Sequence, residues 1–140
     1  MTSLSRDPER ILVLDDDRDW AAIVSSLLKK RFRHARVDVI EDPHEALLAV
    51  DVENYSVIVA DLQMPALSGL EWTRKVRATR RGRDLPIVIV TGSGGAAEWK
   101  EASTLGVAAI LLKPLNGDDL VNVVSRALRE TSPPGKLAAR

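Results

Sequence analysis

The sequence predicts an α/β fold in which a doubly wound, five-stranded parallel sheet carries helices on both faces. Five short apolar runs, most of them rich in Val and Ile, recur along the 140 residues, and segments with helical spacing alternate with them. Parallel pairing with right-handed crossovers turns such an alternation into a sheet covered on both sides. The expected strands are residues 11–14, 37–40, 57–60, 87–90 and 108–112.

The helices are indicated by apolar stripes and by start signals. Asp42, Pro43 and Glu45 supply an N-cap, a first-turn proline and a nearby carboxylate, which predict a second helix after the second strand. Residues 70–79 suit a third helix, and residues 96–105, introduced by a glycine-rich loop, suit a weaker fourth. The first and last helices carry clear stripes, made of Trp20, Ile23, Val24, Leu27 and Leu28, and of Leu120, Val123, Val124, Ala127 and Leu128.

The length and the 45% hydrophobic content suit one globular domain. We expect it to span residues 10–130, with a flexible N-terminus at 1–9 and a flexible tail or linker at 131–140. No apolar stretch approaches the roughly 20 residues that span a bilayer, and the first ten residues are too polar for a signal peptide. The sequence predicts a cytoplasmic location and leaves open whether the chain acts alone or is part of a longer protein.

Composition narrows the classes of function. The chain has no cysteine, which excludes thiol catalysis and thiolate zinc sites, and its two histidines are too few for a histidine-rich metal site. A metal would therefore need oxygen ligands. Basic and acidic residues both number 20, so the net charge gives no reason to expect nucleic acid or membrane binding.

Polar side chains follow four of the five expected strands. Asp15, Asp16 and Asp17 follow the first, Asp61 the third, Thr91 the fourth and Lys113 the fifth. Ligands of open parallel sheets bind beyond the carboxyl ends of the strands, so we expect these groups to converge there. Taken alone the aspartate run would suit a helix cap, but its partners at matching strand ends favour a binding site.

Three neighbouring carboxylates repel one another, and two such charges about 4 Å apart cost on the order of 4 kcal/mol at an effective dielectric near 20. Lys113 supplies one positive charge, and a Mg²⁺ ion held by Asp15 and Asp16 would supply the rest. Asp61 stands alone at the end of a buried strand and is the expected nucleophile toward a phosphoryl group. We expect Thr91 and Lys113 to contact the phosphoryl oxygens.

Four segments resemble the signature segments of response-regulator receiver domains. They read ILVLDDD at residues 11–17, VIVADLQMP at 57–65, IVTG at 89–92 and LLKP at 111–114, and the resemblance covers residues 9–130. It implies a flavodoxin-like sheet of strand order 2-1-3-4-5 and a cis peptide bond before Pro114. It also implies that Asp61 is phosphorylated, and that Asp15, Asp16, Asp61 and the Gln63 carbonyl bind Mg²⁺ while Thr91 and Lys113 contact the phosphoryl group.

The resemblance further implies a signalling domain that catalyses only its own phosphorylation and dephosphorylation. Its partners would be a sensor histidine kinase or histidine phosphotransfer protein and a downstream protein target, and a homodimer stays open. The sequence departs from the family at Ile110, where receivers usually carry Tyr or Phe three residues before the lysine. An aliphatic side chain cannot make the aromatic swing of many relatives, so the sequence leaves open how the signal is relayed.

The sequence leaves two alternative functions open. A haloacid-dehalogenase-type phosphatase would use Asp15 as its nucleophile with Asp17 two residues on, but such enzymes need a further acidic motif well beyond the lysine. A pseudo-receiver would bind partners without phosphotransfer, against which the complete set of pocket residues argues.

Several remaining residues have less specific interpretations. Basic clusters at residues 29–36 and 77–83 fall at helix C-termini, where cations complement the helix dipole, so we expect no direct nucleic-acid binding. Trp72 and Trp99 fit an interface and a partial core equally well. Gly69 and Pro65 are expected to be turn residues that bracket the loop after Asp61.

Overall fold

Five parallel strands form one sheet in the order β2-β1-β3-β4-β5, which confirms both the predicted class and the strand order. The computed structural model describes residues 8–65, 67–92 and 95–130. Apart from residues 8 and 9, the expected flexible ends lie outside the described residues. Ser93, in the glycine-rich loop before the fourth helix, also lies outside them. The elements in order are β1 (Arg10–Leu14), α1 (Arg18–Arg31), β2 (Arg36–Ile40), α2 (Pro43–Val52), β3 (Val57–Asp61), α3 (Gly69–Arg77), β4 (Ile87–Thr91), α4 (Ala96–Thr104), β5 (Ala109–Leu112) and α5 (Gly117–Glu130).

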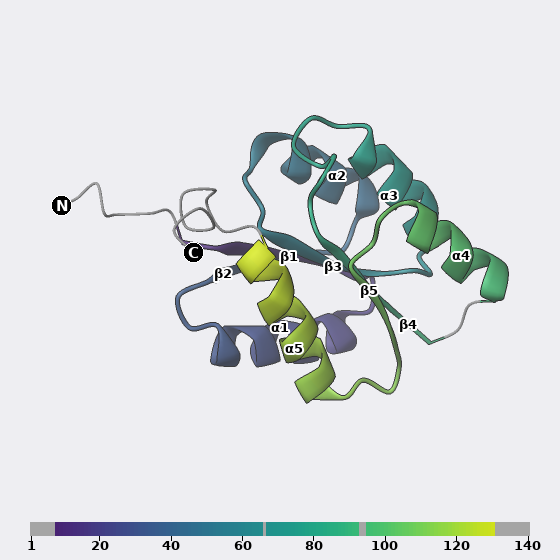
Figure 1. Cartoon of the computed structure of the whole chain (residues 1–140). Coiled ribbons are helices and arrows are strands. Elements are labelled where there is room, and N and C mark those ends of the chain that lie inside the picture. Colours follow the sequence, from purple (N-terminus) through teal and green to yellow (C-terminus); the bar gives the residue numbers. More distant parts are fainter. Residues whose placement is uncertain (1–7, 66, 93–94, 131–140) are drawn as a thin grey trace.

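The helices form a layer on each face of the sheet. Figure 1 shows α1 and α5 below the strands and α2, α3 and α4 above them. Strands β3 and β4 lie in the middle of the sheet and are buried along their whole length, which explains their unbroken apolar sequences. Alternate side chains of the strands therefore feed two separate cores, one under each helical layer.

The helix starts follow the local signals. Asp17 caps α1, because its side chain accepts hydrogen bonds from the backbone N–H groups of Asp19 and Trp20. Asp42 caps α2 with Pro43 in the first turn, as predicted. The third helix begins at Gly69 under a cap from Ser68, so Gly69 is a helical residue and the interpretation of it as a turn residue was wrong.

The structure decides the position of Trp72, which the sequence left open, and corrects that of Ile23. Trp72 is fully buried and donates its indole N–H to the carbonyl oxygen of Pro43, which resolves its two readings in favour of the core. Ile23, expected on the buried stripe of α1, is 57% exposed. Val24 and Leu28 of that stripe are buried as expected, together with Ala21 and Ser25 from outside it. The contact face of α1 is therefore rotated by one position from the most apolar stripe.

The basic clusters lie at helix ends, as predicted. Lys29, Lys30 and Arg31 occupy the last turn of α1. Arg77, in the last turn of α3, donates to the carbonyl oxygens of Gly82, Leu85, Leu105 and Gly106, so it ties α3 to the loops that precede β4 and β5. Among the described residues, no helix combines the length and the apolar character needed to cross a membrane.

Candidate functional site

The carboxyl edge of the sheet gathers the predicted polar residues. Asp15 directly follows β1, Asp61 and Thr91 are the last residues of β3 and β4, and Lys113 directly follows β5. The register of β3 against β4 and of β4 against β5 aligns these strand ends, since Asp61 lies opposite Val90 and Thr91 opposite Leu112. The peptide bond between Lys113 and Pro114 is cis, as the resemblance implied.

Three carboxylates meet at this edge. Asp15, Asp16 and Asp61 each place a carboxylate oxygen within 4.8 Å of the other two. Asp15 and Asp61 are buried at 4% and 8% exposure, whereas Asp16 is exposed, so the cluster reaches the solvent at Asp16. Lys113 Nζ lies 3.4 Å from Asp61 Oδ2 and 3.7 Å from Asp15 Oδ2. One ammonium against three ionised carboxylates leaves this cluster with a net negative charge.

Backbone N–H groups orient the two buried carboxylates. The N–H of Asp17 donates to Asp15 Oδ1 over 2.9 Å, and the N–H of Gln63 donates to Asp61 Oδ1 over 3.0 Å. Each carboxylate thus has one oxygen held by the loop that follows its strand and the other near the ammonium of Lys113. Asp17 takes no part in the cluster of three, because its carboxylate caps α1.

Burial is the largest influence on the pKa of Asp15 and raises it. The Asp17 N–H and the Lys113 ammonium lower that pKa, while the charges of Asp61 and Asp16 raise it, and the net direction is upward. A buried carboxylate whose charged form is disfavoured gains from a nearby cation. Oxygen donors from three side chains on an open rim suit a hard divalent ion that retains some of its water.

The remaining expected site residues border this cluster. Thr91 is fully buried at the end of β4, the strand between β3 and β5. The side chain of Gln63 is exposed in the loop after Asp61. Ile110, three residues before Lys113, is partly buried and packs on the core beneath α2, α3 and α4.

Two residues near the cluster were not recognised from the sequence. The ring centroid of Trp20 lies 5.0 Å from Lys113 Nζ, although the pattern gave Trp20 only a place on a stripe. Gly69 packs against the loop after β3, where an added Cβ would lie 2.6 Å from Asp61 O and Leu62 Cα. The only signal in the sequence is closeness along the chain: Trp20 comes soon after the aspartate run, and Gly69 comes soon after Asp61.

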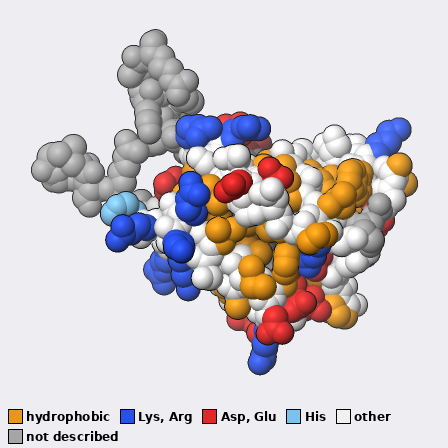
Figure 2. Space-filling model, turned by 90° about the horizontal axis from the view of Figure 1, so that it is seen from below, with side chains coloured by type: hydrophobic (Ala, Val, Ile, Leu, Met, Phe, Trp, Pro, Cys, Tyr) orange, Lys and Arg blue, Asp and Glu red, His pale blue; other side chains and the backbone are white. Residues whose placement is uncertain are grey.

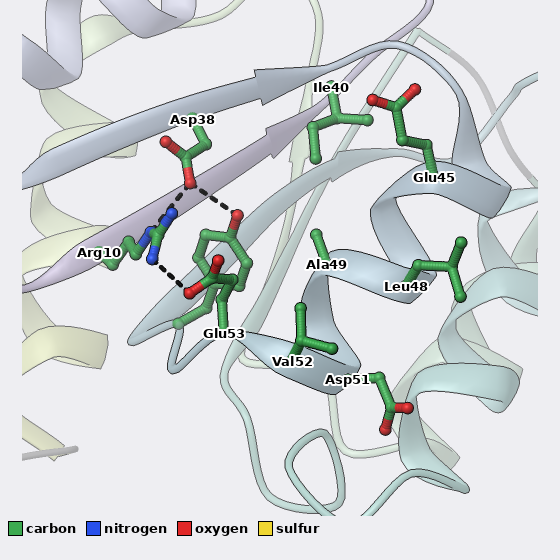
Figure 3. A pocket seen from close by; sticks show the side chains of 10 residues that line it. Arg10, Asp38, Ile40, Glu45, Leu48, Ala49, Asp51, Val52 and Glu53 are labelled. Atoms are coloured by element: carbon green, nitrogen blue, oxygen red, sulfur yellow. Dashed lines mark hydrogen bonds and ion pairs between the residues drawn. The ribbon is translucent and has the colours of Figure 1, made fainter.

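A second hollow lies away from the carboxylates, between β2 and α2 (Figure 3). The charged residues of one wall pair with one another. Arg10 donates to Asp38 and Glu53 over 2.9 and 2.7 Å, and the hydroxyl of Tyr55 donates to Asp38 over 2.7 Å. The other wall carries exposed apolar residues such as Leu48 and Val52. We assign the paired wall a structural role, because its groups satisfy one another.

Comparisons with known proteins agree with this geometry. The sequence model described as the response regulator receiver domain matches residues 11–125. The chain is 35% identical over 127 residues to "Response regulator MprA" of Mycolicibacterium vanbaalenii, covering 90% of this chain and 53% of MprA, so it spans about half the length of that relative. It is 37% identical over 108 residues to the "Chemotaxis protein CheY homolog" of Campylobacter jejuni, covering 75% and 81% of the two chains.

Solved structures share the fold. The receiver domain of the sensor histidine kinase PA1611 from Pseudomonas aeruginosa superposes with a TM-score of 0.77 at 24% identity, over 86% of this chain and 98% of that one. That structure holds a magnesium ion coordinated in its active-site cleft. At this identity the similarity establishes a common fold and nothing further.

Proposed function

The chain belongs to the response regulator receiver domain family, and from this premise we propose that Asp61 accepts a phosphoryl group from a phosphohistidine partner in a Mg²⁺-dependent reaction. The observation that carries the proposal is the grouping of Asp61 with Asp15, Asp16 and Lys113 at one edge of the sheet. Phosphorylation would then switch the contacts of the domain with other proteins. The proposed domain spans residues 10–130.

The reaction requires a carboxylate oxygen of Asp61 to form a bond to phosphorus. The bond between phosphorus and the imidazole nitrogen of the donor breaks, and its electron pair stays on that nitrogen. The Gln63 N–H holds one oxygen of Asp61 and so fixes the orientation of the carboxylate before the donor arrives.

The carboxylates of Asp15, Asp16 and Asp61 would hold Mg²⁺, together with the backbone carbonyl oxygen of Gln63. When bound, the ion neutralises negative charge that gathers on the phosphoryl oxygens and on the acidic cluster. The donor set of this chain supports Mg²⁺, because three carboxylates converge, one of them is exposed to solvent, and the chain has no cysteine thiolate.

Lys113 and Thr91 would contact the transferred group. The Lys113 ammonium lies beside the nucleophile and can pair with a phosphoryl oxygen once Asp61 is modified. The Thr91 hydroxyl, at the end of the neighbouring strand, can donate to a second oxygen. The same contact would draw the loop after β4 toward the phosphoryl group, which couples the site to α4 and supplies a basis for a population shift.

The phosphohistidine donor, a sensor histidine kinase or a histidine phosphotransfer protein, must dock beside this pocket. The first helix begins next to the pocket and exposes Ile23. Figure 2 shows the molecule from below, the side on which Figure 1 places α1 and α5, and there hydrophobic side chains gather in the middle while Lys and Arg side chains lie at one edge. An apolar surface next to the acidic edge offers such a donor a place to bind. We propose this face for donor docking.

The two alternative functions are less well supported. In a dehalogenase-type phosphatase Asp17 would act beside Asp15, yet its carboxylate is engaged in capping α1. A pseudo-receiver without phosphotransfer has no need of the buried Asp61 beside Lys113.

Incubation with acetyl phosphate and Mg²⁺, followed by intact mass measurement, tests the proposal. We expect uptake of one phosphoryl group, its loss in Asp61→Asn, and its retention in the control Asp51→Asn, which removes an exposed carboxylate from α2. Labelling that survives Asp61→Asn but disappears in Asp15→Asn would favour the phosphatase. No labelling of the folded wild-type protein would favour the pseudo-receiver.

A further inference from the structure

The indole ring of Trp20 forms one wall around the Lys113 ammonium. Lys113 Nζ lies 5.0 Å from the ring centroid, within the range of a cation–π interaction, while its two carboxylate partners lie at 3.4 and 3.7 Å. The Lys113 side chain is 23% exposed, so the ammonium is partly withdrawn from water. Trp20 also lines a cavity of about 10 Å³ together with Asp15 and Asp61.

The aspartate run itself sets the position of Trp20. Asp17 Oδ1 accepts hydrogen bonds from the N–H groups of Asp19 and Trp20, which fixes the first turn of α1 directly after the metal-binding residues. The backbone of Trp20 is therefore fixed in the first turn of α1, the helix that follows β1. Lys113 follows β5, which β3 and β4 separate from β1 in the sheet, so the two residues meet only in the folded chain.

We propose that Trp20 is a positioning residue that holds the Lys113 ammonium in the acidic pocket, an inference that rests on the proposed phosphorylation of Asp61. Lysine is a point charge on a flexible four-carbon stem and needs fixed partners to stay in one place. Its carboxylate partner Asp61 changes when the phosphoryl group arrives. The attraction of the ring face does not depend on the state of Asp61, so the ammonium remains in the pocket through the reaction.

The ring is not held by its own polar group. Trp20 Nε1 is buried and has no hydrogen-bond partner among the described residues, so the orientation of the indole depends on packing and on the ammonium. Replacing Trp20 by Phe therefore removes no hydrogen bond and keeps an aromatic face. Replacing it by Leu keeps an apolar side chain but removes the face. A comparison of the two variants therefore distinguishes the effect of the cation–π contact from the effect of apolar burial.

The rate of phosphoryl uptake from acetyl phosphate in saturating Mg²⁺ provides the first test. We expect Trp20→Leu to be about 2- to 30-fold slower than the wild type, with Trp20→Phe between the two. The matched control is Trp99→Leu, which removes a half-buried tryptophan whose Nε1 is likewise unpaired, from α4, and should keep the wild-type rate. A wild-type rate in Trp20→Leu would overturn the proposal.

A double-mutant cycle tests whether Trp20 acts through Lys113. In a Lys113→Gln background, Trp20→Leu should cause no further slowing, because the charge that the ring attracts is gone. Equal slowing by Trp20→Leu in both backgrounds overturns the proposal. Should Trp20→Leu fail to fold, the same cycle with Trp20→Phe decides between these outcomes.

A measurement that does not depend on phosphorylation distinguishes a failure of this inference from a failure of the proposed function. The ε-methylene protons of Lys113 should resonate upfield of ordinary lysine values, because the indole ring current shields them, and Trp20→Leu should abolish the shift in NMR spectra. If the wild-type protein takes up no phosphoryl group, the proposed function fails, while the shift still supports the contact. Ordinary Lys113 chemical shifts in the wild type would refute the positioning of the ammonium by Trp20.

Discussion

The indole N–H of Trp72 donates a 2.7 Å hydrogen bond to the carbonyl oxygen of Pro43, and so joins α3 to the first turn of α2. Both helices lie on the same face of the sheet, and Trp72 is fully buried between them and the core. We expect Trp72→Phe to lower the free energy of unfolding by about 1–3 kcal/mol, through the lost hydrogen bond and the cavity. Urea denaturation measures this. Trp99→Phe loses no hydrogen bond and should change stability by less than about 1 kcal/mol, and equal effects of the two variants would contradict the assignment of Trp72 to the core.

Gly69 lets the backbone of α3 approach the loop after Asp61. Its N–H donates to the carbonyl oxygen of Leu62 over 2.7 Å, and an added Cβ would meet Asp61 O at 2.6 Å. Gly69→Ala should therefore push this loop away, lower stability by about 2 kcal/mol and slow phosphoryl uptake at Asp61. The comparison is Gly95→Ala, where an added Cβ meets nothing within 4 Å and the cost should stay below about 1 kcal/mol. Normal stability and normal uptake in Gly69→Ala would show that the loop tolerates the displacement.

Asp15→Asn should have opposite effects on stability and on metal binding. The pKa of Asp15 is raised in the folded protein, mainly by burial, so its protonated form supports folding at low pH and this contribution is lost as the pH rises through the folded-state pKa. Asparagine has no charge and can still accept the Asp17 N–H. At pH 7 without metal, we expect the variant to be more stable than the wild type in thermal unfolding.

Added Mg²⁺ should reverse this order. A ligand at 100 times its Kd stabilises the folded state by about 2.7 kcal/mol, and the wild type should gain this while Asp15→Asn gains much less. Removal of the ion with EDTA should restore the metal-free order. Equal stabilisation of both proteins by Mg²⁺ would place the ion elsewhere.

The acid stability of the protein should depend on Asp38. Burial alone would raise its pKa, but the hydrogen bonds from Tyr55 and Arg10 outweigh burial, and the pKa is lowered. The stabilisation is therefore present above the unfolded-state value, about 3.9, and is lost as the pH falls through the lower folded-state pKa. Asp38→Asn should flatten the pH dependence of unfolding between about pH 5 and 2, measured by circular dichroism. Asp51→Asn, from the same hollow, should leave that dependence unchanged.

The charge network around Asp38 could not be predicted from sequence patterns. Its members come from β1, from β2 and from the loop between α2 and β3, and nothing local in the sequence pairs Arg10 with Glu53 or Asp38 with Tyr55. The strand ends were easier to predict, because the sheet has a single carboxyl edge and every parallel strand delivers its last residues there.

The sequence by itself determined the alternation of strands and helices, the cap at Asp42, and the polar residues at the strand ends, because local periodicity and hydrogen bonding specify these features. Tertiary structure decided which helix face is buried and which neighbours meet. It placed Trp72 in the core, left Ile23 exposed and brought Trp20 to Lys113. These outcomes depend on how helices cross the sheet and on contacts between residues far apart in the chain, which no spacing within one element encodes.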